Sequence, residues 1–338
     1  MSRITLGRHY PCDADRRALG LLLALSLIAS ALLLAGCGSK YWREVPSGEK
    51  QPLAAVSFPD ARHGWAVGDA GTIVATSDGG ASWHAQSSGT RSDLVAVDFP
   101  DARHGWVVGA AGTILATGDG GSTWHRQQSR VHGMLGAVDF IDAQNGWVGS
   151  DDGRLLATRD GGRSWRWSYV PNAAVVAGLA FTGPRLGWAI AWDSGGSQAT
   201  SVLQTVDGGA HWSLQRDVPE SSYSISFLDR RHGWIADGPS VYATSDGGAK
   251  WTRQTLPQKA EADAVSFADA EHGWAVGSEG SIVTTADGGH TWTVHYMGSW
   301  DTLTGVAALD AGHACAVGFT GSATLSDKSD GLILALRR

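Results

Sequence analysis

The stretch Thr76-Ser77-Asp78-Gly79-Gly80-Ala81-Ser82-Trp83, TSDGGASW, occurs six times in this chain with small changes. The aspartates of the six copies are Asp78, Asp119, Asp160, Asp207, Asp246 and Asp287, and the tryptophans that follow are Trp83, Trp124, Trp165, Trp212, Trp251 and Trp292. A second motif, which ends in Gly-Trp, places tryptophans at 65, 106, 147, 188, 234 and 274. Both motifs return after 39 to 47 residues. A repeat of this length predicts one supersecondary unit used along the whole chain.

Each repeat contains four short segments with strand character. In the second copy these are LVAVDF (94–99), HGWVVG (104–109), GTILAT (112–117) and STWHRQ (122–127), joined by turns rich in Gly and Asp. Four short strands in a unit of this size are typical of a propeller blade. The sequence therefore predicts an all-β fold made of four-stranded blades.

The two ends of the repeat region predict how the ring closes. Trp42 lies 41 residues before Trp83, so the segment around it supplies only a fourth strand. Near the C-terminus, Cys315 stands where the Gly-Trp motif has its tryptophan, and residues 331–335 copy a third strand. We predict a seven-bladed β-propeller over residues 42–338, whose last blade joins three C-terminal strands to the N-terminal one and so removes an open sheet edge.

The first 36 residues have the pattern of a bacterial lipoprotein signal peptide. Four arginines precede an apolar run from Ala18 to Leu34, which leads into Leu34-Ala35-Gly36-Cys37. We expect residues 1–36 to be removed, Cys37 to be acylated and inserted in a lipid bilayer, and residues 37–41 to form a short linker. The protein would then be exported and anchored on the periplasmic side of the cell envelope. Gly38 favours the outer membrane, and a thylakoid is the alternative in a photosynthetic cell.

Charge and cysteine content exclude several classes of protein. The formal net charge is −7 and the isoelectric point is near 5.9, so we expect no nucleic-acid partner. Cys12 lies in the signal peptide and Cys37 is the acylation site, which leaves Cys315 alone. An intramolecular disulfide or a cysteine metal site is therefore not expected.

The repeated Asp-Gly-Gly turn is interpreted as a structural device. A carboxylate can accept N–H groups of the next residues, the glycines can take positive φ, and the tryptophan can pack on the turn. The pattern Ser/Thr-x-Asp-x-Gly-x-x-Trp resembles the Asp-box, or bacterial neuraminidase repeat, which implies a hairpin lock away from any active site. Each copy offers a single carboxylate, so a calcium loop is not expected.

Recurrent histidines occupy one place in five blades, at positions 63, 104, 232, 272 and 313. Because each belongs to a separate blade, we interpret them as groups that bond within a turn rather than as a metal cluster. We expect neither a metal ion nor a cofactor.

Candidate binding residues are sought where the blades differ. Arginine precedes the Gly-Trp tryptophan by three residues at Arg62, Arg103, Arg185 and Arg231, whereas the same slot holds Gln144, Glu271 and Gly312 in the other blades. These arginines form a candidate partner-binding patch, and the alternative is that each pairs with an aspartate such as Asp60, Asp101 or Asp229. Trp192 and Trp300 fall in segments that we expect to be irregular loops, so they are the aromatic candidates, with loop packing as the alternative.

The pattern F-x-D-x-x-H-G-W-x-V-G-x-x-G-x-I-x-x-T-x-D-G-G-x-x-W, over residues 42–338, resembles the photosystem II assembly and stability factor family. The resemblance implies a seven-bladed, non-enzymatic propeller that binds a newly made reaction-centre subunit through an arginine-rich face. Arg62, Arg103, Arg185 and Arg231 would then be partner contacts. Cyanobacterial members resemble this chain in having a lipoprotein signal. We thus expect a monomeric, lipid-anchored protein that assists assembly or stability of a membrane protein complex.

The rival interpretation is a cell-surface glycan-binding protein or glycoside hydrolase, because sialidases and xyloglucanases include Asp-box propellers. Such an enzyme needs two suitably separated carboxyl groups, or a tyrosine nucleophile with an arginine triad. The Arg-Ile-Pro stretch typical of sialidases is absent. Non-enzymatic binding is favoured, although sequence spacing leaves a carboxylate pair open.

Overall fold

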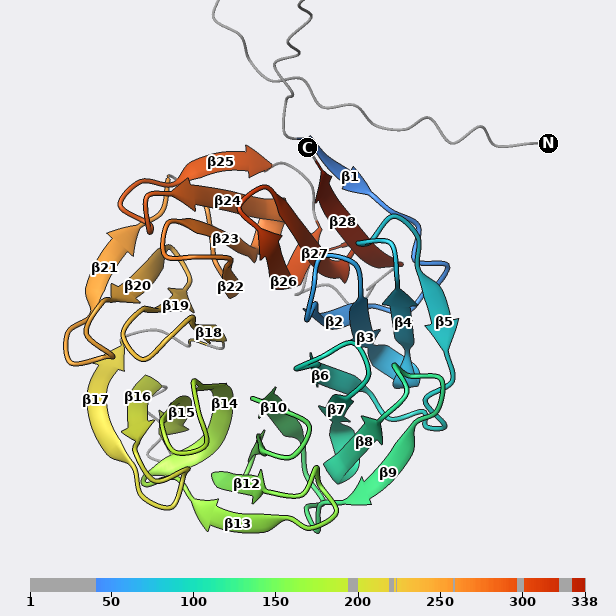
Figure 1. Cartoon of the computed structure of the whole chain (residues 1–338). Helices are drawn as coiled ribbons and strands as arrows, with labels where there is room; N and C mark the ends of the chain where they lie inside the picture. Colours follow the sequence, from blue (N-terminus) through green and yellow to red (C-terminus); the bar gives the residue numbers. More distant parts are fainter. Residues whose placement is uncertain are drawn as a thin grey trace, which may run out of the picture. The chain divides into compact units, whose positions relative to one another are not determined.

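In a computed structural model, the chain from Tyr41 onward forms a ring of seven four-stranded antiparallel sheets (Figure 1). The structure describes residues 41–193, 200–218, 222, 224–257, 259–296, 301–321 and 330–337. The all-β, seven-bladed prediction is confirmed. None of the helical segments in these residues is long and apolar enough to cross a membrane.

We number the blades along the chain. Blade 1 contains β2 (Leu53–Ser57), β3 (Gly64–Gly68), β4 (Ile73–Thr76) and β5 (His84–Gln86). Blade 2 contains β6 (Leu94–Asp98), β7 (Gly105–Gly109), β8 (Thr113–Thr117) and β9 (His125–Gln128). Blade 3 contains β10 (Leu135–Phe140), β11 (Gly146–Ser150), β12 (Arg154–Thr158) and β13 (Arg166–Tyr169). Blade 4 contains β14 (Ala173–Phe181), β15 (Gly187–Asp193), β16 (Thr200–Thr205) and β17 (Ser213–Val218). Blade 5 contains β18 (Ser224–Phe227), β19 (Gly233–Asp237), β20 (Ser240–Thr244) and β21 (Thr252–Thr255). Blade 6 contains β22 (Ala264–Phe267), β23 (His272–Gly277), β24 (Ser281–Ala286) and β25 (Thr293–Tyr296). Blade 7 contains β26 (Thr302–Asp310), β27 (His313–Phe319), β28 (Gly331–Arg337) and β1 (Tyr41–Glu44). Three short 3₁₀ turns, η1 (Asp69–Gly71), η2 (Ala110–Gly112) and η3 (Ser278–Gly280), join second to third strands.

The core lies between the blades. Strand β7, the second strand of blade 2 with sequence GWVVG, is buried at every position, because the sheets of neighbouring blades cover both of its faces. Trp65 and Val67 of blade 1 pack in one cluster with Leu94 and Phe99 of blade 2. The outermost strand β9, with sequence HRQQ, is largely exposed. Burial is therefore high in the second strand and low in the outermost strand. We call the contact between two neighbouring blades a seam and number it by its two blades.

The ring closes as the sequence predicts. β1 pairs with β28 in antiparallel register, with Tyr41 opposite Arg337 and Glu44 opposite Leu334. The first and last strands of the propeller thus lie side by side (Figure 1). A main-chain ladder, rather than a loop, joins the ends of the ring.

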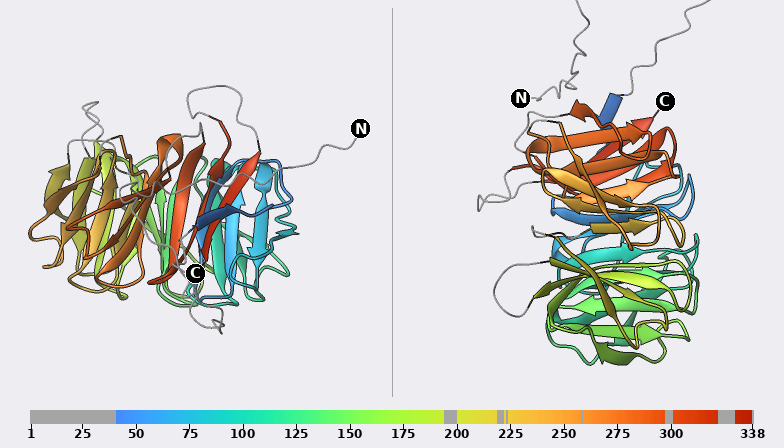
Figure 2. Two further views of the ribbon diagram at one scale, coloured as in Figure 1. Left: turned by 90° about the horizontal axis from the view of Figure 1, so that it is seen from above. Right: turned by 90° about the vertical axis from the view of Figure 1, so that its left-hand side faces the viewer.

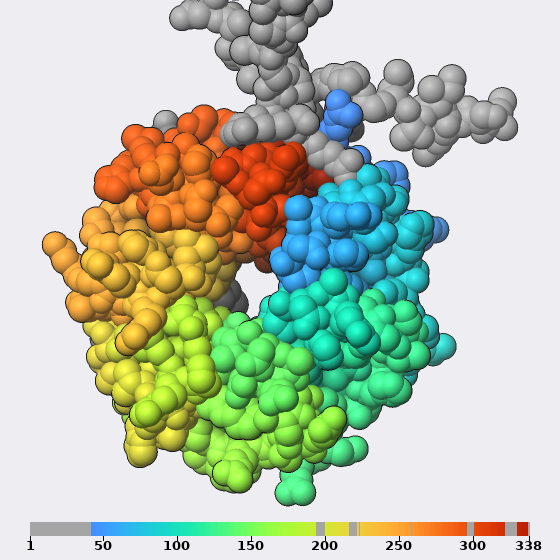
Figure 3. Space-filling view, viewed as in Figure 1, coloured from blue at the N-terminus to red at the C-terminus, as the bar shows by residue number. Residues whose placement is uncertain are grey.

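The turns gather on two opposite sides of the disc (Figure 2). The turns between first and second strands lie beside the Asp-Gly-Gly turns of the same blade, since the N–H of Gly79 donates to the carbonyl of Arg62 at 2.8 Å and that of Gly120 to Arg103 at 2.9 Å. We call the side made of these two sets of turns the Asp-box face. A space-filling view shows an opening in the middle of the ring (Figure 3).

Candidate functional site: the Asp-box face

The Asp-Gly-Gly turn is held by hydrogen bonds within itself. In blade 2 the hydroxyl of Thr117 donates to Asp119 Oδ1 at 2.8 Å and accepts the N–H of Gly121 at 2.9 Å. Asp119 also accepts the N–H of Thr123 at 2.9 Å and its hydroxyl at 2.7 Å. Gly120 and Gly121 have φ of 70° and 83°, which only glycine adopts at little cost.

These bonds also fix the charge of the turn. Hydrogen bonds from the Thr123 hydroxyl and N–H, and then from the Thr117 hydroxyl, lower the pKa of Asp119 to about 2. The carboxylate is ionised at neutral pH and directed into its own turn. The aspartates that accept a threonine hydroxyl in this way are Asp78, Asp119, Asp160, Asp207, Asp246 and Asp287.

The two tryptophan motifs meet at one phenylalanine in each of the five seams from 1/2 to 5/6. Trp65 of blade 1 stacks on Phe99 of blade 2, with ring centroids 3.6 Å apart, and its indole N–H donates to the carbonyl of Gly120 at 3.2 Å. Trp124, the Asp-box tryptophan, meets the same Phe99 edge to face at 5.9 Å. Trp83, Trp165, Trp212, Trp251 and Trp292 make the same edge contact with the phenylalanine of their own blade. The motif therefore joins its turn to the preceding blade.

The recurrent histidines bond within their turns. His232 Nδ1 lies 2.8 Å from Asp229 Oδ2, and this contact with the N–H groups of Arg231 and His232 lowers the pKa of Asp229 to about 2. His63, His104, His272 and His313 lie against Asp60, Asp101, Asp269 and Asp310 in the same way. The described part of the chain has no group of three or more His, Cys, Asp or Glu side chains that could hold a metal ion.

All four candidate arginines are exposed on the Asp-box face. The Nε–H of Arg62, Arg185 and Arg231 donates to the carbonyl of Ser77, Val206 and Ser245 in the neighbouring Asp-Gly-Gly turn, at 3.4, 3.2 and 3.2 Å. The carboxylates of Asp60, Asp101 and Asp229 instead accept the main-chain N–H of Arg62, Arg103 and Arg231. Within the described residues the guanidinium groups therefore do not form the salt bridges that were the alternative. Neutral carbonyl groups set the orientation of Arg62, Arg185 and Arg231.

The arginines do not form one uniform patch around the ring. Blades 4 and 5 add exposed apolar side chains on the same face, Val206 at 63% and Leu228 at 38% exposure. Two further arginines accompany them: Arg230 is exposed beside Arg231, and Arg159 of blade 3 donates to the carbonyl of Pro184 at 2.8 Å. The guanidinium carbon of Arg159 also lies 4.9 Å from the centroid of Trp147. A search confined to the repeated arginine slot misses these residues, because they occupy other positions in the repeat.

The aromatic candidates lie elsewhere than expected. Trp192 belongs to strand β15, not to a loop, because the second strand of blade 4 continues to Asp193. The Trp192 side chain is half-buried, and its indole N–H donates to the carbonyl of Ser222 at 3.1 Å. Trp300 lies outside the described residues. Among the residues that the structure describes, Trp167 and Tyr169 on the outer strand β13 are exposed aromatics, at 55% and 63%, with ring centroids 5.4 Å apart. Strand alternation at the outer edge of blade 3 is the signal that places them in solvent.

Two carboxylates on the inner strands are the groups that a glycosidase interpretation would first consider. Burial raises the pKa of Asp98 to about 6, and burial with the charge of Asp98 raises that of Asp139 well above its usual range. Each accepts a main-chain N–H of the next blade: Asp98 that of Phe140 at 2.6 Å, and Asp139 that of Phe181 at 2.5 Å. Ser57 accepts the N–H of Phe99 in the same position, so this place in the repeat has a structural task.

Comparison with solved structures places the fold among known propellers. A structure described as "YCF48 bound to D1 peptide" is 19% identical, with a TM-score of 0.70 over 88% of this chain and 97% of that chain. YCF48 from Cyanidioschyzon merolae is 21% identical, with a TM-score of 0.66 over 88% and 98%. The GH74 enzyme of Niastella koreensis is 14% identical, with a TM-score of 0.64 over 86% of this chain and 55% of that chain. At these identities the likeness shows the fold alone.

Sequence comparison is more specific. A search of the curated proteins found no match. The sequence model of one family, described as "Photosynthesis system II assembly factor YCF48", matches residues 35–94, 81–168 and 165–264, which together span well over half of the chain. The chain therefore belongs to the photosynthesis system II assembly factor YCF48 family.

Proposed function

We propose that this protein is a non-enzymatic, lipid-anchored propeller that binds a membrane protein and assists the assembly or stability of its complex. The observation that carries the proposal is the set of exposed arginines on the Asp-box face, in a member of an assembly factor family. The Nε–H groups of Arg62, Arg185 and Arg231 bond to turn carbonyls, so these three guanidinium groups are held in place before a partner arrives. Preorganised arginine loses little side-chain freedom on binding and suits recognition of carboxylates.

The partner is proposed by analogy. A structural neighbour is described as bound to a D1 peptide, so a related propeller binds a peptide of another protein. For this chain we propose a subunit of a membrane complex as the partner, and a photosystem if the cell is photosynthetic.

The location is proposed from the N-terminal sequence. Acylation of Cys37 would place the propeller at the membrane surface where such a subunit is assembled, on the periplasmic side of the envelope or in a thylakoid. Replacing Cys37 by Ser should release the protein into the soluble fraction. Continued membrane association of the Cys37→Ser protein without acylation would refute this part of the proposal.

The decisive experiment is a pull-down from detergent-solubilised membranes. The bait is the full-length protein, compared with a variant in which Arg62, Arg103, Arg185 and Arg231 are changed to Glu. A matched control carries four reversals away from the Asp-box face, at the exposed Lys50, Arg91, Arg126 and Arg130. We expect a membrane protein that is captured by the wild type and the control and lost in the first variant.

The same experiment can overturn the proposal. Equal loss in both variants would show that overall charge, not the Asp-box face, governs capture. Retention on a glycan array, with no membrane protein captured, would favour the glycan-binding or glycosidase interpretation.

A further inference from the structure

We infer that the Asp-box face has one peptide-binding track, which runs from blade 4 across blade 5 into the groove between blades 5 and 6. The track takes an extended segment that carries both acidic and apolar side chains. This inference rests on the proposed function and assigns binding to one sector of the face, with Arg62 and Arg103 outside it.

The arginines of the track belong to turns that contact one another. Arg159 of blade 3 donates to Pro184 in the turn that holds Arg185, and Arg185 donates to the carbonyl of Val206. Blades 4 and 5 are joined by the indole N–H of Trp188, which donates to the carbonyl of Gly247 at 2.9 Å. The N–H of Gly247 in turn donates to the carbonyl of Arg231. Continuous contacts therefore run from blade 3 to blade 5.

Apolar surface lies along the same path. Val206 is in the turn whose carbonyl binds Arg185, and Leu228 begins the turn that holds Arg230 and Arg231. Blades 1 and 2 have Ser77 and Gly118 in place of Val206, and Pro59 and Pro100 in place of Leu228. Exposed valine and leucine beside arginine offer an apolar contact for a neighbouring side chain of the ligand, which an arginine patch alone does not.

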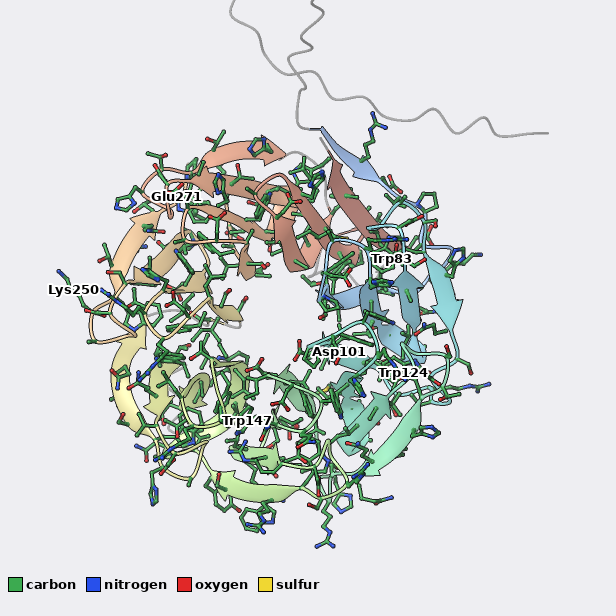
Figure 4. The ribbon with its side chains drawn as sticks, viewed as in Figure 1. Trp83, Asp101, Trp124, Trp147, Lys250 and Glu271 are labelled. Carbon is green, nitrogen blue, oxygen red and sulfur yellow. The ribbon has the colours of Figure 1, made fainter. Side chains whose placement is uncertain are left out.

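A groove of about 850 Å³ continues the path between blades 5 and 6. Its walls include Ser245, whose carbonyl binds Arg231, together with Trp234 and the charged side chains of Lys250, Arg253 and Glu271. Lys250 projects from the outer margin of blade 5, and Glu271 lies on blade 6 (Figure 4). The groove gives an extended chain a place to continue beyond the two arginines.

Charge selects an acidic ligand for this sector. The paired turns of blades 3 to 5 carry six basic side chains against five aspartates, namely Arg159, Arg163, Arg185, Arg230, Arg231 and Lys250 against Asp142, Asp160, Asp207, Asp229 and Asp246. Blades 1, 2 and 6, whose two turns are also described, carry two against seven, namely Arg62 and Arg103 against Asp60, Asp78, Asp101, Asp119, Asp269, Glu271 and Asp287. The acidic side chains of the segment are therefore attracted to blades 3 to 5 and repelled from blades 1 and 2, and the end that enters the groove beside Glu271 of blade 6 carries apolar rather than acidic side chains.

The test begins with a phage library of random octapeptides, selected on the full-length protein in detergent. We expect the selected peptides to contain both Asp or Glu and apolar residues. The best peptide is then measured by fluorescence polarisation against paired variants. Arg185→Gln with Arg231→Gln should weaken binding at least tenfold, Val206→Ser with Leu228→Ser three- to tenfold, and the matched Arg62→Gln with Arg103→Gln less than twofold.

The outcomes separate this inference from the proposed function. An equal loss in the Arg62/Arg103 variant, or selection of peptides without acidic residues, overturns the track. If a variant that loses binding also unfolds at a lower temperature, Lys250→Gln is measured instead, because it changes only an exposed side chain. Lys250→Gln should weaken binding two- to fivefold. An unchanged affinity contradicts the groove. If the peptide binds with these effects of the variants but the pull-down captures no membrane protein, the track is supported and the proposed function is refuted.

Discussion

The seam between blades 2 and 3 and the seams around blade 7 use different means to hold the ring. In seam 2/3, Trp106 stacks on Phe140 at 3.5 Å and donates to the carbonyl of Gly161 at 3.3 Å. In seam 6/7, Ala308 takes the place of the phenylalanine, and the buried indole nitrogen of Trp274 has no hydrogen-bond partner within the described residues. In seam 7/1, Cys315 replaces the tryptophan.

The difference shows that two positions of the repeat depend on each other. A Cβ atom at Gly146 would lie 2.3 Å from the ring of Phe140, so the phenylalanine requires glycine before the tryptophan. Blade 7, which has lost the phenylalanine, has Ala314 at that position. The ladder between β1 and β28 holds this blade instead. Aromatic stacks therefore reinforce the seams from 1/2 to 5/6, whereas blade 7 relies on aliphatic packing at its seams and on the main-chain ladder that closes the ring.

The largest effect should come from removing the stacked tryptophan. Trp106→Ala deletes a side chain that is 2% exposed, its stack and its hydrogen bond, and should lower the free energy of unfolding by about 3–5 kcal/mol. Trp274→Ala is the matched control, equally buried but with neither phenylalanine stack nor indole hydrogen bond, and should cost less. Urea unfolding of both variants measures the difference. Equal losses would show that the stack adds nothing beyond burial.

The next effect compares two threonines of strand β8. The buried Thr117 hydroxyl accepts the N–H of Gly121, so Thr117→Val leaves that N–H without a partner and should cost about 1–3 kcal/mol. Thr113 is also buried, and its hydroxyl has no hydrogen-bond partner in the described part of the chain. Thr113→Val should be neutral or stabilise by up to about 1 kcal/mol. Similar losses in both variants would contradict the lock attributed to the Asp-box.

The coupling of phenylalanine and glycine can be transplanted to blade 7. Ala308→Phe alone should cost about 1–3 kcal/mol, because the ring meets the Cβ of Ala314. Adding Ala314→Gly makes room for a stack on Trp274 and should recover that loss together with about 0.5–1.5 kcal/mol. Thermal unfolding of the two single variants and the double variant gives the coupling. Additive effects would refute the dependence.

Sequence periodicity is enough to predict the seven blades, the closure through Trp42 and the turn chemistry of Asp119, because these depend on local patterns that repeat. The aromatic stacks are not predictable, since Trp65 and Phe99 belong to different repeats and meet only when two blades pack. Trp192 is a similar case: the sequence alone does not show that β15 extends to Asp193. The binding sector is the hardest part, because Arg159, Val206 and Leu228 come together through contacts between blades.

The smallest effect concerns pH and the inner strands. In seam 2/3 the carboxylate of Asp98 accepts the N–H of Phe140, whereas in seam 6/7 the hydroxyl of Ser266 accepts the N–H of Ala308 at 3.1 Å. Burial raises the pKa of Asp98 to about 6, above the value of about 3.9 expected in the unfolded chain. The folded state therefore binds this proton more tightly, and its stabilising contribution is fully present below about pH 4 and lost as the pH rises through 6.

Asp98→Ser keeps the hydrogen bond between blades and removes that loss, and it also removes the charge that raises the pKa of Asp139. The difference in free energy of unfolding between the variant and the wild type should therefore grow in favour of the variant between pH 4 and pH 8. The Asp-box aspartates titrate in the opposite sense: the pKa of Asp119 is lowered to about 2, so its contribution is present above about pH 4 and is lost only below it. Because those groups are common to both proteins, they cancel in the difference. A difference that stays flat from pH 4 to pH 8 would mean that solvent in the ring, not burial, sets the charge of Asp98.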